Sequence, residues 1–389
     1  MAPVAASSQP LHDRLPALDR MRGLVIALMA VDHASEAFNA GRFRGDAAWL
    51  HEAGSPIPTD QFLLRWITHL CAPAFFFLMG AAMALKAGKD RAAGLPQAAT
   101  DRYLVARGAI LILLDLGFVS LFWGEPAEGV FLFGVLAGLG MALLVLVPLR
   151  RLRPRALLLL ALAGIAAHEL VLGLLLRGAL EGADPRTFRP GPWIGVGLSG
   201  GFVRPLFVIY PLLPWCLVAV LGHAFGTVLP SWSRARTERI LTLAGLAALA
   251  VFVVVRLVDG YGNLLLLRGE HTLVRWLHVS KYPPSVSFLA LELGLLALVL
   301  AGLSRFGPAA QGQPGVRAPF RLLGSAALFF YVLHIPLLEG AAAWTGLHRG
   351  AGIGAALLAA LGVVLVALPP CAFYLRLRRR HPQSLLRFL

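Results

Sequence analysis

In the segment LDRMRGLVIALMAVDHASEAFN, residues 18–39, the ionisable residues Asp32, His33 and Glu36 follow directly on the apolar stretch 23–31. His33 titrates near neutral pH, so its imidazole is suited to take a proton from an attacking hydroxyl or amine. Glu36 lies three residues further on, on the same side of a helix. It is therefore a better local partner for the imidazole than Asp32, the sequence neighbour. We predict acid–base chemistry at this point, with His33, Glu36 and Asp32 as candidate catalytic residues.

The start of the same predicted helix carries a second charged group. Asp19 and Arg22 share a helix face with His33, and Arg22 lies about 16 Å from His33 along the helix. A polar line of this kind must face protein or water, because lipid would not tolerate it. Arginines at its start are suited to bind phosphates. The predicted cofactor-binding residues are Arg22, Asp19 and Arg20.

Three other segments bring titratable side chains toward the predicted depth of His33. His69 stands in ITHLC, His334 in LFFYVLH, and Lys281 with Tyr282 in KYPPS. Their polar groups are suited to stabilise a developing oxyanion or to hold an acceptor. We place His69 with the candidate catalytic residues. The predicted substrate-binding residues are Lys281, Tyr282, His334, Arg65 and His51.

The composition indicates how these residues are positioned. The chain has 389 residues, of which 58% are hydrophobic and 14% charged, and its mean hydropathy is +0.74. Soluble proteins carry about 25% charged residues. We predict an all-α polytopic membrane protein, surrounded by a lipid bilayer. About ten transmembrane helices are expected, at roughly 20–40, 62–85, 103–122, 129–149, 155–177, 203–229, 238–258, 284–303, 319–340 and 352–375.

The basic residues predict the orientation of these spans. With the N-terminus in the cytoplasm, 23 of the 35 lysines and arginines fall on the cytoplasmic side. This asymmetry follows the positive-inside rule, so both termini are predicted to be cytoplasmic. The expected organisation is a disordered cytoplasmic tail at 1–17, one transmembrane domain at 18–376 and a basic cytoplasmic tail at 377–389.

Several functional classes have little support in the sequence. The net charge of +15 would suggest nucleic acid in a soluble protein, but here the basic residues stand at the ends of apolar runs. No nucleic-acid partner is therefore expected. The chain has neither a glycine-rich phosphate loop nor an HExxH motif, so no metal site is predicted. Its three cysteines lie in apolar segments without a pairing pattern.

Ordered motifs along the chain resemble a known family. LDRMRGLVIALMAVDH, ITHLCAPAFFFLMGAAMAL, YPLLPW, KYPPS and LFFYVLH are similar to motifs of bacterial membrane proteins related to heparan-alpha-glucosaminide N-acetyltransferase. The spacing from Arg22 to His33 also resembles that of membrane acyltransferases that O-acetylate cell-surface glycans, in which an essential histidine follows an arginine by eleven residues. The family's proposed acetyl-accepting histidine lies in the loop before the second helix. Here that loop contains only His51, in the sequence WLHEAG.

The resemblance implies a fold of about ten helices in the bacterial inner membrane. It also implies a cytoplasmic acetyl-CoA or other acyl-CoA donor, and a glycan or small-molecule acceptor on the extracytoplasmic side. We expect a membrane acyltransferase that moves an acyl group, such as acetyl, to a sugar hydroxyl or amine. One alternative is a proton-coupled transporter or permease, in which the polar line conducts protons or a solute. A second is a b-type haem protein with axial ligands among His33, His69 and His334.

Overall fold

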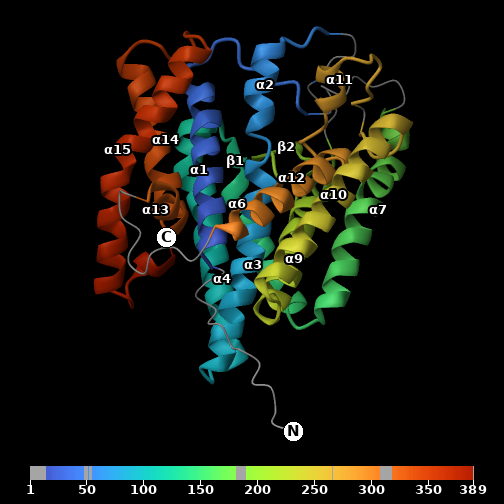
Figure 1. Ribbon diagram of the computed structural model, residues 1–389. Helices are drawn as coiled ribbons and strands as arrows, with labels where there is room; N and C mark the ends of the chain where they lie inside the picture. The colour runs from blue at the N-terminus through green and yellow to red at the C-terminus, as the bar shows by residue number, and fades with distance from the viewer. Residues whose placement is uncertain are drawn as a thin grey trace.

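The computed structural model describes residues 15–47, 51, 55–180, 190–264, 266–306 and 318–388. Its long helices lie side by side, with α14 and α15 at one edge, α7 and α10 at the other, and α1 between them (Figure 1). The long helices are α1 (Leu15–Phe38), α3 (Cys71–Ala92), α4 (Gln97–Leu113), α6 (Val135–Leu149), α7 (Pro154–Leu180), α9 (Leu212–Val228), α10 (Arg234–Val258), α12 (Val286–Arg305), α14 (Ala327–Trp344) and α15 (Ile353–Arg380).

Shorter elements connect or extend these helices. They are α2 (Thr59–Ile67), η2 (Leu114–Val119), α5 (Ser120–Trp123), η3 (Pro126–Glu128), β1 (Phe131–Phe133), α8 (Pro192–Ile194), η4 (Gly195–Ser199), β2 (Gly201–Val203), β3 (Leu206–Val208), η5 (Leu229–Ser231), α11 (Leu273–Leu277), α13 (Pro319–Ser325) and η6 (Leu385–Phe388).

Within the described residues, eight helical segments are long and apolar enough to cross a bilayer. The predicted all-α, polytopic membrane fold is therefore confirmed. The predicted spans 20–40 and 129–149 are not among the eight. The first corresponds to α1, which carries several charged residues, and the second to α6, which has only 15 residues. A count of ten spans with both termini in the cytoplasm stays a prediction.

The predicted span 62–85 is broken near its N-terminal end. Helix α2 ends at Ile67 and α3 begins at Cys71. In a continuous helix the carbonyl of His69 would need an amide hydrogen from Pro73, which has none, and the proline ring would clash with that carbonyl. The break places Arg65 and Thr68 beside α1, where both side chains contact Asp32, and it places His69 beside Asp46 in the loop after α1.

Two of the predicted helical spans begin too early. Residues 131–133 and 201–208 form a three-stranded sheet of order β1-β3-β2, in which β1 is parallel to β3 and β2 is antiparallel to it. The prediction of helix from 129 and from 203 is wrong for these residues. Pro205 and Pro211 lack the amide hydrogens that a helix through this stretch would use.

Helix α1 is held by elements from the far end of the chain. It packs against α13, α14 and α15, and also against α3 and α12. A side chain at Gly23 would collide with the carbonyl of Phe320, so glycine allows the close approach of α1 and α13. This packing brings α14 beside the C-terminal half of α1. Chain residues that lie about 300 positions apart therefore meet around His33.

The ends of the described chain extend the helices beyond the predicted membrane domain. Helix α1 already begins at Leu15, and the remainder of the predicted tail at 1–17 lies outside the described residues. Helix α15 continues to Arg380, inside the segment predicted as a basic tail, and η6 follows at Leu385–Phe388. The Tyr374 hydroxyl donates a hydrogen bond of 3.0 Å to the carbonyl of Leu386, which holds η6 against α15.

Candidate active site

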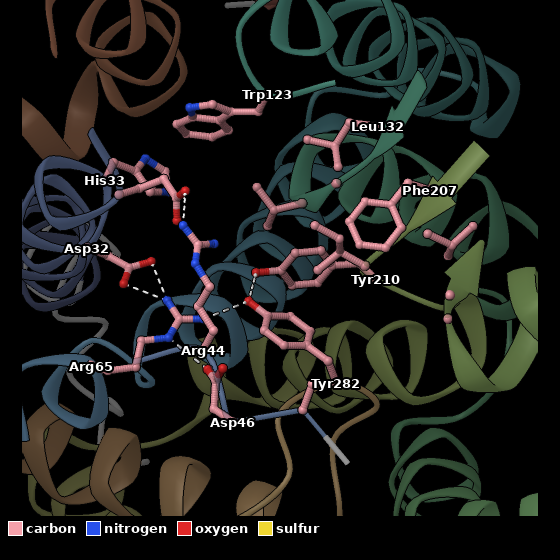
Figure 2. Close-up of a pocket in the computed structure, with 18 of the residues that line it drawn as sticks. Asp32, His33, Arg44, Asp46, Arg65, Trp123, Leu132, Phe207, Tyr210 and Tyr282 are labelled. Atoms are coloured by element: carbon pink, nitrogen blue, oxygen red, sulfur yellow. Dashed lines mark hydrogen bonds and ion pairs between the residues drawn. The ribbon is translucent and has the colours of Figure 1, made fainter. Parts of the chain in front are cut away.

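A cavity of about 440 Å³ lies between α1 and the small sheet. Figure 2 shows its two unlike sides. The polar side comes from α1, the loop after it and α2, and the opposite side is mainly apolar and comes from β1, the start of α6 and β3. The polar side includes Asp32, His33, Glu36, Arg42, Arg44, Asp46 and Arg65, and the apolar side includes Leu132, Val135, Phe207 and Val208.

His33 is paired with a second histidine from α14. Its Nδ1 lies 2.6 Å from Nε2 of His334, and Nδ1 of His334 lies 3.1 Å from the carbonyl oxygen of Phe330. Because a carbonyl only accepts, the hydrogen-bond pattern assigns a proton to Nδ1 of His334. Nε2 of a neutral His334 then accepts from Nδ1 of His33. This leaves Nε2 of His33 with a lone pair and no partner among the described residues.

The surroundings of His33 fix the ring further. Trp123 contacts it edge-on with ring centroids 4.6 Å apart, and the indole nitrogen donates to Glu339 at 2.8 Å. The 2.6 Å separation of the two histidine nitrogens leaves no room for an iron ion between them. The pair is therefore not arranged as the axial ligands that the haem hypothesis requires. A ring held on two sides, with one free nitrogen on a cavity wall, has the geometry of a general base.

Asp32 belongs to a separate network centred on Arg65. Nη1 of Arg65 lies 2.6 and 2.8 Å from the two carboxylate oxygens of Asp32, and Nε lies 2.7 Å from Asp46 (Figure 2). Arg42 and Thr68 each donate to the Asp32 carboxylate at 3.0 Å. The Arg65 side chain is only 8% exposed. Its charge is therefore matched by two carboxylates in a site where an unpaired charge would be costly.

The network of Arg65 extends to the loop before α12. His69 is 3.2 Å from Asp46, and the backbone amide of Lys281 donates to the carbonyl of Asp46 at 2.8 Å. The Tyr282 hydroxyl lies 3.2 Å from that of Tyr210 and 3.5 Å from a nitrogen of Arg65. Tyr282 thus lines the cavity, whereas the buried Lys281 packs behind it.

Glu36 lies among arginines and not beside the imidazole. Its carboxylate is 2.8 Å from Arg42, 2.6 Å from Arg44 and 3.1 Å from Arg349. The three-residue spacing favoured Glu36 as the partner of His33, but tertiary packing provides His334 instead. Asp32, which was the weaker local partner by spacing, is occupied by Arg65. Asp32 and Glu36 therefore order the arginine groups around the cavity.

Asp46 is the carboxylate of this site that lies outside the helices. Burial by itself would raise its pKa. The charge of Arg65 and the hydrogen bond from His69 act more strongly together and hold the pKa of Asp46 well below its ordinary range. Asp46 is therefore ionised at physiological pH. It serves as a fixed negative partner for Arg65 and is not a proton acceptor.

His51 lies outside the cavity, in contact with α11 and the residue that follows it. Its Nε2 is 3.3 Å from Arg275, and its ring contacts that of His278 edge-on at 4.5 Å. His278 is buried and donates from Nε2 to the carbonyl of Gly45 at 2.7 Å. Burial lowers the pKa of His278 to about 4, with the hydrogen bond and the nearby Asp46 opposing this shift and His51 and Arg275 adding to it.

His278 makes the free energy of unfolding of the protein depend on pH. Above about pH 6.5 it is neutral in both the folded and the unfolded chain. Between that pH and about pH 4 only the unfolded chain takes up the proton, so the free energy of unfolding falls, by roughly 3 kcal/mol in total from this group. We expect the melting temperature of the detergent-purified protein to fall over this range. His278→Gln keeps a hydrogen-bond donor to the carbonyl of Gly45 and should make the melting temperature depend less on pH. An equal fall in melting temperature for the variant and the wild type would contradict this role of His278.

The predicted cofactor-binding residues lie at the other end of α1. Arg22 donates to Asp19 at 2.6 Å, and Arg20 lies 3.4 Å from the carbonyl of Phe306. These residues do not line the cavity around His33. At 1.5 Å per residue, the length of α1 between Arg22 and His33 is about 16 Å. The charged residues at the start of α1 and His33 near its end therefore belong to two separate sites.

A comparison with protein families identifies the chain. The family model described as heparan-alpha-glucosaminide N-acetyltransferase, catalytic, matches residues 14–257, which is more than half of the chain. The chain belongs to this family. The resemblance inferred from the ordered motifs is therefore confirmed. No curated protein matches the chain in a sequence search.

Membership of the heparan-alpha-glucosaminide N-acetyltransferase family makes this a member of a membrane-embedded transferase family. The matched region contains His33, Arg65 and the cavity-lining sheet, whereas Tyr282, Tyr331 and His334 lie beyond it. In the part of the chain that the structure describes, no three His, Cys, Asp or Glu side chains are grouped so as to hold a metal ion.

Several cavity residues of this family member were not predicted from the sequence. Arg42, Arg44 and Asp46 belong to the stretch GRFRGD directly after α1, where a dense group of charges at a membrane boundary is a usable signal. Tyr331 stands three residues before His334 in LFFYVLH, on the same side of a helix. Trp123 and Arg349 carry no such signal, because only packing brings them to the cavity.

Proposed function

We propose that this protein transfers an acyl group, such as acetyl, from an acyl-CoA donor to a hydroxyl or amine of a sugar acceptor. The observation that supports this most directly is the His33–His334 pair. It presents one unprotonated imidazole nitrogen to a cavity large enough for reacting groups. Membership of an acetyltransferase family is consistent with this chemistry. The identity of the acyl donor and that of the acceptor are also proposed.

The chemistry requires one proton to move twice. The acceptor oxygen or nitrogen attacks the thioester carbonyl carbon, while Nε2 of His33 takes the acceptor's proton. The C–O π electrons move onto the carbonyl oxygen. When they return, the C–S bond breaks with its electron pair on sulfur, and His33 gives the proton to the leaving thiolate. His334 holds the His33 ring and receives its Nδ1–H, so the charge on the imidazolium is shared with a second ring.

The polar groups around the cavity have separate roles in this proposal. Tyr282 and Arg65 lie where an acceptor would contact them, and His69 and Lys281 hold that wall through Asp46. Arg22, with Arg20 and Asp19, would contact the phosphates of the donor at the inner end of α1. His51 lies beside the outer loop and has no role in the proton transfer.

The proposal includes an orientation in which donor and acceptor lie on opposite sides of the bacterial inner membrane. The distribution of basic residues supports this orientation, because 23 of the 35 lysines and arginines fall on the cytoplasmic side if both termini are in the cytoplasm. Thr59 at the start of α2 is then outside, and Ser231 after α9 is inside. Both residues are exposed, whereas the three native cysteines are buried.

A thiol reagent that does not cross membranes tests this orientation. In intact cells we expect it to label Thr59→Cys but not Ser231→Cys. After the membrane is permeabilised, both variants should react, and the wild-type protein should give little background because its cysteines are buried. Labelling of Ser231→Cys alone in intact cells would reverse the proposed topology.

The proposed activity is tested by the release of free thiol from acetyl-CoA by the purified protein in the presence of an amino sugar or a neutral sugar. Acceptor-dependent thiol release that requires His33 supports the proposal. Uptake of a solute into vesicles without thioester consumption would instead support the permease alternative.

A further inference from the structure

Tyr331 is a cavity residue to which the proposed chemistry has given no role. It stands on α14, close to one helical turn before His334, and lines the same cavity as His33. Its ring lies edge-on to both histidines, with centroids 6.0 Å from His33 and 5.3 Å from His334. The phenol is therefore fixed beside the candidate base by packing on both imidazoles. The backbone of Tyr331 lies within α14, which restricts the position of the phenol further.

The hydroxyl of Tyr331 is the unusual part of this arrangement. The residue is only 6% exposed, yet no described residue makes a hydrogen bond with its hydroxyl. The oxygen is also absent from the fully enclosed polar atoms without partners, so it retains some open surface. A buried tyrosine hydroxyl normally has a hydrogen-bond partner. Here the open surface available to it is the cavity that the side chain lines.

The other polar aromatic side chains on the cavity wall already take part in hydrogen bonds. The hydroxyls of Tyr210 and Tyr282 lie 3.2 Å from each other, and the indole nitrogen of Trp123 donates to Glu339. The arginines are paired with Asp32, Glu36 and Asp46. Among the described aromatic residues of the cavity, Tyr331 is thus the one whose polar group makes no hydrogen bond. A neutral donor next to a base is suited to a group that becomes negative during the reaction.

We propose that the Tyr331 hydroxyl donates a hydrogen bond to the thioester carbonyl oxygen as that oxygen becomes an oxyanion. This inference rests on the proposed function. Attack on the carbonyl carbon forms the new C–O or C–N bond and shifts the C–O π electrons onto the oxygen that Tyr331 contacts. Collapse of this intermediate returns those electrons and breaks the C–S bond. Tyr331 keeps its proton throughout, and the transferred proton moves only between the acceptor, His33 and the thiolate.

Tyr331→Phe tests this role because it removes one oxygen atom and preserves the ring. We expect kcat for acetyl-CoA to fall about 100-fold, with KM nearly unchanged, because the lost hydrogen bond forms mainly in the transition state. Tyr103→Phe is the matched control. It makes the same change on α4, where the ring stacks on Phe388 and does not line the cavity. The melting temperatures of both variants should stay close to that of the wild type.

Two further measurements separate this role from a structural or proton-transfer role. With trifluoroacetyl-CoA the oxyanion is less basic, so the loss caused by Tyr331→Phe should be smaller than with acetyl-CoA. The pH dependence of kcat should keep its shape. An equal loss with both donors, a changed pH profile, or a variant as active as the wild type would each overturn the inference. A wild-type protein that turns over no acyl-CoA would instead refute the proposed function on which it rests.

Discussion

His33→Ala should lower the turnover of acyl-CoA by the purified protein by about 10²- to 10⁴-fold, the range over which a positioned general base contributes. The physical reason is that His33 is the group whose free nitrogen faces the cavity, while its other nitrogen is held by His334 at 2.6 Å. Alanine removes the base and leaves the ion-pair network of Arg65 intact. The loss should appear in both kcat and kcat/KM, because proton transfer occurs in the transition state.

The measurement is thiol release from acetyl-CoA with the acceptor sugar present. His223→Gln provides the matched control, since His223 is also a buried histidine on a membrane helix but does not line the cavity. It should retain nearly all of the activity. Melting temperatures of both variants show whether either protein is misfolded. Equal turnover by His33→Ala and the wild type, in folded protein, would refute the role of His33 and with it the proposed mechanism.

Arg65→Leu should be the most destabilising single substitution in the polar part of the site. It leaves Asp32 and Asp46 without their shared cation, and both carboxylates are largely buried. Removing one partner from a buried ion pair typically costs about 3–5 kcal/mol, because the remaining charge is left uncompensated. Arg42 and Thr68 still contact Asp32, so we expect Asp46 to be the more affected of the two.

A thermal melt in detergent measures this effect, with Arg151→Leu as the control. Arg151 also pairs with an aspartate, Asp101, but its side chain is 59% exposed, and exposed pairs contribute only about 0–1 kcal/mol. The double variant Arg65→Leu/Asp46→Leu should recover part of the lost stability, because it removes one of the two stranded charges. If Arg65→Leu had the same melting temperature as Arg151→Leu, the network of Arg65 would not stabilise the protein.

The sequence was sufficient to predict the class of fold and the family. A low charge content and long apolar runs indicate a polytopic membrane protein because lipid excludes charge over about 20 residues of helix. The ordered motifs from LDRMRG to LFFYVLH indicated the family that the family model confirms. Element boundaries were less predictable, since Pro73 breaks one predicted span and the prolines around β3 replace the start of another helix with strands.

The site could be predicted only in part, and its partners not at all. The position of each residue along the chain relative to the predicted spans put His33, His69, His334 and Tyr282 near one expected depth, because depth in a membrane follows from position along a helix. Helical periodicity offered Glu36 as a partner for His33, since it relates only residues on the same helix. The structure instead joins His33 to a histidine 301 positions away. It gives Asp32 to Arg65, which is 33 positions away and reaches it through the break between α2 and α3.

The sequence by itself thus determined that this chain is a helical membrane protein of an acetyltransferase family with ionisable groups inside several of its apolar segments. Only the tertiary structure decided which of those groups meet. Hydrogen bonds and ion pairs form over about 3 Å, so they depend on how helices pack and rotate against one another. That packing is set by contacts such as Gly23 against Phe320, which no local pattern around His33 contains.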